Sequence, residues 1–130
     1  MKEKKDITNR NDIENLIRIF YEKLLSDESL SYIFTDVAKI ELEPHILLIS
    51  DFWENLIFGS DTYRRNAMQP HLELNKQTPL KKEHFDAWLA HFKNSVDELF
   101  AGEKAHFAKN RAQSIAMVMQ VKILNPESKL

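Results

Sequence analysis

The chain has 130 residues, of which 43% are hydrophobic and 10% aromatic, so it has the length of one domain and enough apolar side chains for a packed core. Its formal net charge of −2 shows no basic excess, which argues against nucleic acid and anionic membranes as partners. Cysteine is absent, which excludes a disulfide framework, a thiolate metal site and a cysteine nucleophile.

Glycine is scarce, with two in 130 residues, and no Asn-Gly or Asp-Gly pair marks a hairpin. Gly59 and Gly102 stand where helices are expected to end. Apolar residues recur at helical spacing in the long segments. The sequence therefore predicts an all-α fold.

The first predicted helix begins at Asn11 or Asp12, since both side chains are good helix caps. Tyr21 belongs to its apolar stripe, so we expect a buried ring whose hydroxyl needs a hydrogen-bond partner. A short helical turn over residues 30–34 then carries Phe34 inward. The stripe consists of Ile13, Leu16, Ile17, Phe20, Tyr21, Leu24 and Leu25.

A second long helix is predicted from Pro44, because proline is tolerated in the first turn of a helix. Its apolar residues cover more than half of its circumference, which is typical of a helix that is sandwiched or covers a large ligand. His45 lies one turn before Ile49, near the entry of this helix. The apolar residues are Ile46, Leu47, Leu48, Ile49, Phe52, Trp53, Leu56, Ile57 and Phe58.

Two further long helices are predicted, over about residues 81–100 and about 103–124. Between them and the earlier helices, His71 precedes these two helices in the chain and stands in a short segment bounded by Pro70 and Pro79. A neutral imidazole is a good ligand for haem iron when it faces an apolar pocket. The sequence therefore indicates a haem site.

The chain resembles the truncated haemoglobins, which are two-over-two globins, and is most similar to the third group of that family. The resemblance covers about residues 11–124, and no single one of its motifs is specific, whereas their order and spacing together are. They are Phe20-Tyr21-Glu22-Lys23, Ile33-Phe34, His45 eight residues before Trp53, Met68-x-x-His71-Leu72-x-Leu74, Phe85-x-x-Trp88-Leu89, and Arg111-Ala112-Gln113.

The resemblance implies a globin-like sandwich of helices around haem b (iron protoporphyrin IX), with His71 as the proximal iron ligand. It also implies that Tyr21, His45 and Trp88 form a polar distal group around a bound ligand such as O2. The other side chains expected at the haem are Phe34, Ile49, Phe52, Trp53, Met68 and Phe85, with Tyr63 and Arg64 as candidate partners of the propionates.

Other histidines have simpler interpretations. His84 is the only rival of His71 as proximal ligand, and because it opens a long helix we expect it to face solvent or a propionate. His91 and His106 are expected to be satisfied or solvated side chains. Whether His45 approaches the iron or swings outward stays open.

Three functions are compatible with these residues. The first is reversible binding of O2 or another diatomic ligand. The second is a haem enzyme with peroxidase-like or nitric oxide chemistry, served by an electron donor, and the third is a ligand-free helical interaction module that keeps a globin shape.

We expect one domain over residues 1–130, with residues 1–10 and 125–130 frayed. The longest apolar run, residues 46–49, is far too short to span a bilayer, and no apolar run follows the basic N-terminus. We therefore expect a cytoplasmic monomer without membrane contact.

Overall fold

The computed structural model describes residues 4–59, 74–75 and 77–124. These residues contain helices and no strand, so the all-α prediction is confirmed. The helices are α1 (Arg10–Ser26), α2 (Glu28–Tyr32), α3 (Leu42–Phe58), α5 (Lys82–Leu99) and α6 (Glu103–Leu124), with a π-helical turn η1 (Ile33–Val37) after α2.

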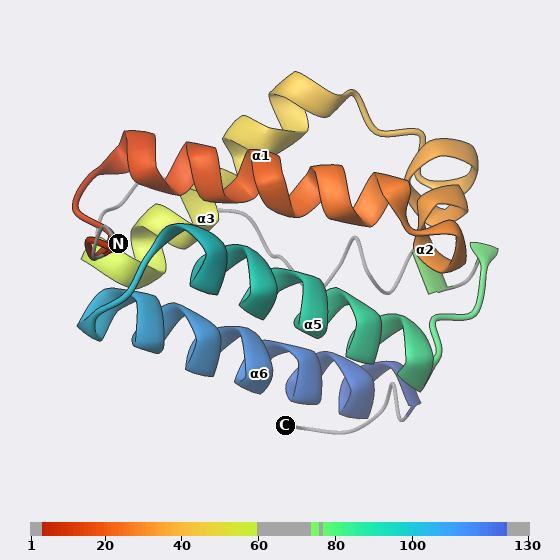
Figure 1. The fold of residues 1–130 in the computed structure, drawn as a ribbon. Coiled ribbons are helices and arrows are strands. Elements are labelled where there is room, and N and C mark those ends of the chain that lie inside the picture. Colours follow the sequence, from red (N-terminus) through yellow and green to blue (C-terminus); the bar gives the residue numbers. More distant parts are fainter. Residues whose placement is uncertain (1–3, 60–73, 76, 125–130) are drawn as a thin grey trace.

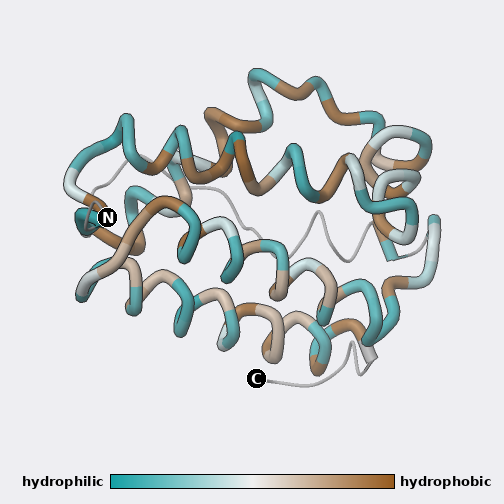
Figure 2. Tube along the Cα trace, in the orientation of Figure 1, coloured by the Kyte–Doolittle hydropathy of each residue, from teal (hydrophilic) through white to brown (hydrophobic). Residues whose placement is uncertain are grey.

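The helices pack as two pairs that cross one another. Helices α5 and α6 run side by side, and α1 lies over α5 and crosses α3 (Figure 1). Arg10 on α1 is tied to α3 by ion pairs with Asp51 and Glu54, at 2.5 and 3.1 Å. Along each helix hydrophobic residues recur between hydrophilic ones, as expected for helices that bury one side (Figure 2).

The core of the molecule contains four aromatic rings from three helices. Phe92 of α5 is fully buried, and its ring centroid lies 5.2 Å from that of Phe20 and 4.6 Å from that of Trp53. Trp88, one turn earlier on α5, stacks near Phe92 at 6.0 Å. These contacts hold α1 and α3 against α5.

The helix ends follow from caps and glycine. Asn9 caps α1 by accepting a hydrogen bond from the backbone N–H of Asp12 at 2.9 Å, so α1 begins slightly before the predicted Asn11 or Asp12. Asp12 is thereby left inside the first turn, where it accepts from the N–H and hydroxyl of Thr8. Helix α3 ends at Gly59, which has the left-handed φ of +69° that closes a helix.

The segment before α1 is packed on the fold, in contrast to the fraying expected for residues 1–10, as far as residues 4–9 are concerned. Ile7 is 1% exposed and belongs to the core. The Asp6 carboxylate accepts hydrogen bonds from the backbone N–H groups of Lys104 and Ala105, both at 2.9 Å, and so caps α6. Gly102 is required beside it, because a Cβ there would lie 2.5 Å from the carboxylate carbon of Asp6.

We predict that Asp6→Ala lowers the free energy of unfolding by about 1 kcal/mol, because the first turn of α6 loses its cap. Partial burial alone would raise the pKa of the Asp6 carboxyl, but the three backbone N–H donors outweigh it and hold the pKa below its ordinary value. The contribution is therefore complete above the ordinary pKa of 3.8 and is lost as the pH falls through the lower folded value. Urea unfolding at several pH values measures it.

The matched control is Asp86→Ala, which removes an exposed ion pair with Lys82 inside one helix. Its effect on stability is expected to be about 0.5 kcal/mol or less. Equal losses in the two variants, or a loss at Asp6 that does not shrink in acid, would contradict the capping role.

Candidate functional site

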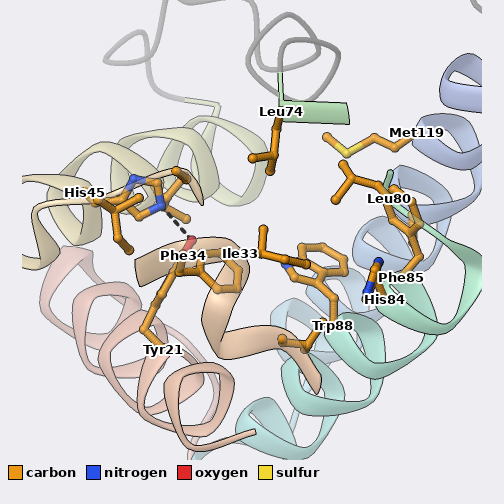
Figure 3. Close-up of a pocket in the computed structure, with 15 residues that line it drawn as sticks. Tyr21, Ile33, Phe34, His45, Leu74, Leu80, His84, Phe85, Trp88 and Met119 are labelled. Atoms are coloured by element: carbon orange, nitrogen blue, oxygen red, sulfur yellow. Dashed lines mark hydrogen bonds between the residues drawn. The ribbon is translucent and has the colours of Figure 1, made fainter. Parts of the chain in front are cut away.

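An apolar cavity of about 340 Å³ lies between α1, the α2–η1 turn, α3, α5 and α6. Figure 3 shows side chains from all of these elements directed into it. Its wall is mostly hydrocarbon, with polar groups at Tyr21, His45, Trp88 and His84. The lining residues are Tyr21, Leu30, Ile33, Phe34, Ala38, Ile40, His45, Ile49, Leu74, Leu80, His84, Phe85, Trp88, Ala116 and Met119.

Tyr21 and His45 meet at one end of the cavity. The Tyr21 hydroxyl lies 2.8 Å from Nε2 of His45, and the two rings pack edge to face with centroids 5.2 Å apart. Figure 3 shows this bond joining α1 to the start of α3. The pairing supplies the partner that the buried Tyr21 hydroxyl was expected to need.

Tyr21 keeps its proton in this setting. The residue is 5% exposed, and its burial raises the pKa of the phenol above its ordinary value. Phe34 packs against the same ring at 5.7 Å. The hydroxyl is therefore a neutral O–H group at physiological pH, held in an apolar surrounding by one polar neighbour.

Trp88 completes the polar trio expected from the sequence. It lies on α5 one turn after His84, and its ring packs edge to face on Phe20 at 5.7 Å. Because Tyr21, His45 and Trp88 all line one cavity, the structure brings the three residues together. Their role toward a bound ligand stays a prediction.

His84 also lines the cavity, which qualifies the expectation that it faces solvent. Its Nδ1 accepts a hydrogen bond from the backbone N–H of Lys81 at 3.0 Å, so in the neutral ring the proton is on Nε2. Nε2 lies 3.4 Å from the hydroxyl of Tyr32, which is an exposed residue. His84 is therefore a half-buried group with hydrogen bonds at both ring nitrogens.

The remaining described histidines have structural partners, as expected. Nε2 of His91 lies 2.7 Å from the carboxylate of Asp27. Hydrogen bonds from Ser29 and the contact with His91 lower the pKa of Asp27 to about 2. His106 is exposed and pairs with Asn110 at 3.0 Å.

Several expected haem contacts lie elsewhere. Trp53 is 2% exposed and stacks on Phe92 in the core, and neither it nor Phe52 is among the residues that line the cavity. The expectation that these two side chains form the cavity wall is therefore without support in the geometry. Tyr63, Arg64, Met68 and His71 lie outside the described residues.

Some lining residues were not singled out by the sequence. Leu30, Ala38 and Ile40 surround η1, and π-helical turns are frequent at functional sites but leave no periodic signal in a sequence. Leu80 directly follows Pro79. Met119 could have been found, since it lies on the predicted inward stripe of the last helix.

A family model described as bacterial-like globin matches residues 5–123 of the chain. The protein belongs to the bacterial-like globins. A group 3 truncated haemoglobin of Campylobacter jejuni is 31% identical to this globin over 115 residues, which are 86% of this chain and 88% of that protein. The crystal structure of a group III truncated haemoglobin from Campylobacter jejuni matches with a TM-score of 0.83 and 28% identity, covering 96% of this chain and 98% of that one.

These similarities confirm the truncated-haemoglobin resemblance and the truncated-globin fold. Membership of the family supports a haem-binding globin, and haem with a small diatomic ligand is what the family implies. Within the described residues, no helix is long and apolar enough to cross a membrane. The same residues contain no group of three or more acidic or histidine side chains that could hold a metal ion by themselves.

The protonation state of Tyr21 can be tested directly. We predict that wild type and Tyr21→Phe give the same rise in ultraviolet tyrosinate absorbance as the pH passes the ordinary tyrosine pKa of 10.0, because the buried phenol does not ionise while the protein is folded. Circular dichroism defines the pH range in which the helices persist. A smaller absorbance rise in the variant within that range would show that Tyr21 titrates like an exposed phenol.

Proposed function

We propose that this globin binds haem b in the cavity and reversibly holds O2 or another diatomic ligand there. The observation that carries the proposal is the buried hydrogen bond between Tyr21 and His45 inside a cavity that is otherwise hydrocarbon apart from Trp88 and His84. Buried polar side chains facing an apolar hollow cost stability, and they are typical of a binding site. Haem, when bound, would supply the iron at which the diatomic ligand is held.

The lining residues fit a flat and largely apolar group. Phe34, Ile49 and Phe85 present hydrocarbon to the cavity from three different elements, as the porphyrin faces would require. The polar side chains stand on opposite sides, with Tyr21 and His45 at one end and His84 at the other (Figure 3). The arrangement suits a guest with an apolar body and polar edges.

His71 is the proposed iron ligand. Leu74, three residues further along the chain, lines the cavity, and three residues of chain span at most about 11 Å. His84 is the weaker candidate, since its Nδ1 is taken by the Lys81 N–H and its Nε2 is directed to Tyr32 at the rim. Binding iron through Nε2 would require His84 to give up the Tyr32 contact.

Tyr21, His45 and Trp88 are the proposed distal donors. A neutral phenol donates one hydrogen bond, an indole N–H donates one, and a neutral imidazole donates from one nitrogen. The phenol of Tyr21 remains protonated because of its burial, so it can donate at any physiological pH. Donors beside a bound O2 slow its release.

A haem enzyme with peroxidase-like or nitric oxide activity is the second candidate. The 2.8 Å contact between Tyr21 and His45 favours it, because a phenol and an imidazole at this distance can share or pass a proton. Either activity would need an electron donor to restore the iron. Turnover with peroxide or nitric oxide, set beside the rate of O2 release, separates the enzyme from the carrier.

We predict that His71→Ala abolishes stable haem retention, because the iron loses its protein ligand. The measurement is the haem absorption band of the purified protein, reduced, with and without carbon monoxide. His106→Ala is the matched control, since His106 is exposed and pairs only with Asn110 among the described residues, and it should retain haem normally. A wild-type protein that is colourless and takes up no added haemin would contradict the whole proposal.

The rival ligand is tested in the same experiment. His84→Ala is expected to keep the haem absorption band and its shift with carbon monoxide. Loss of haem in His84→Ala together with retention in His71→Ala would reverse the assignment of the iron ligand.

We predict that Tyr21→Phe raises the O2 dissociation rate roughly 2- to 10-fold, as expected when one hydrogen bond of about 0.5–1.5 kcal/mol is lost. Stopped-flow displacement of O2 measures the rate. Tyr32→Phe removes a hydroxyl from an exposed residue outside the cavity lining and should leave the rate unchanged. An unchanged rate in Tyr21→Phe would make Tyr21 a core residue only.

A further inference from the structure

A second hollow lies on the outer side of the α5–α6 pair. It has a volume of about 310 Å³ and is open to solvent. One lining residue, Leu89, belongs to α5, and the others belong to α6. The α6 residues are Gln113, Ala116, Met117, Gln120 and Val121.

Ala116 lines both hollows, although it is only 3% exposed. Its side chain is a single methyl group, so little more than that methyl and the neighbouring side chains separates the outer hollow from the cavity. Elsewhere along the same stripe, Ala105, Ala108 and Ala112 are fully packed into the core. Ala116 is therefore the position where the close α5–α6 contact gives way to open space on both sides.

Neighbouring residues on each helix divide in the same way. On α5, Trp88 lines the inner cavity and Leu89 the outer hollow. On α6, Met119 lines the inner cavity and Gln120 the outer hollow. Consecutive residues of a helix point about 100° apart, so the seam between the hollows follows one line along both helices, with Ala116 in it.

We propose that small apolar gases enter the cavity from the outer hollow through this seam, over the methyl group of Ala116. The inner wall at the seam is apolar, which suits O2, carbon monoxide, nitric oxide and xenon and disfavours ions. Fluctuation of the Leu89 and Met117 side chains on the nanosecond scale is enough to pass a diatomic molecule. The alternative entrance, past His45, is closed by the hydrogen bond to Tyr21.

The connection itself can be tested without haem, and this arm is independent of the proposed function. Apolar cavities of about 150 Å³ already bind xenon, so both hollows are large enough for it. We expect xenon added to the haem-free protein to shift the methyl NMR signals of Leu89 and Met119 together. In Ala116→Phe, whose ring fills the seam, the Met119 shift is expected to disappear. A Met119 shift that persists in Ala116→Phe would overturn the proposed route.

The second arm rests on the proposed function and uses the haem-loaded protein. After photolysis of the carbon monoxide complex, we expect Ala116→Phe to lower the bimolecular rebinding rate on the order of tenfold, as an added barrier of about 1.4 kcal/mol would. Val118→Phe is the matched control, because it adds the same ring at an exposed position two residues away that lines neither hollow. It should rebind carbon monoxide at the wild-type rate.

Leu89→Trp keeps the test decisive if Ala116→Phe does not fold, since it closes the outer hollow from α5. Slower rebinding in Leu89→Trp supports the route. Wild-type rebinding in either variant, with the haem absorption band intact, would overturn it and direct attention to the His45 side. A wild-type protein that takes up no haem would sink the proposed function while leaving the xenon result valid.

Discussion

The contact of Phe92 with Phe20, Trp53 and Trp88 is the interaction on which the rest of the structure depends. These rings come from α1, α3 and α5, and their centroids lie 4.6–6.0 Å from that of Phe92. Each buried aromatic ring contributes a large apolar area, and paired rings add about 0.5–1.5 kcal/mol beyond it. Because the core is concentrated at Phe92, the opposite ends of the same helices can leave a hollow between them without losing their relative positions.

That hollow is costly in the haem-free protein. Unfilled apolar space forfeits packing contacts, at about 24 cal/mol per Å³ in engineered cavities of another protein, and the Tyr21 and His45 side chains lose hydration on burial. Their mutual hydrogen bond offsets part of the second cost. A guest that fills the cavity recovers the packing, so binding and folding stability are coupled. The polar pair thus serves the empty and the filled protein in different ways.

Sequence periodicity was sufficient for the helices and for part of the site. It assigned Tyr21 and Phe85 to stripes that do face the cavity, because each of these helices buries one narrow side. It was insufficient for α3, whose apolar residues cover more than half of the circumference, so the pattern could not say that Trp53 packs on Phe92 instead of lining the cavity. The cap that Asp6 provides for α6 was also beyond reach, because no local signal links a carboxylate to N–H groups 98 and 99 residues away.

The same long-range cap has a consequence for synthesis of the chain. Asp6 leaves the ribosome early, whereas Lys104 and Ala105 are among the last residues to be added. At roughly 5–20 residues per second, the interval between them lasts about 5–20 s. Until then Ile7 has no α6 to pack beside, and the N-terminal segment stays accessible to chaperones and proteases. Closure of this contact would therefore mark the completion of the nascent fold.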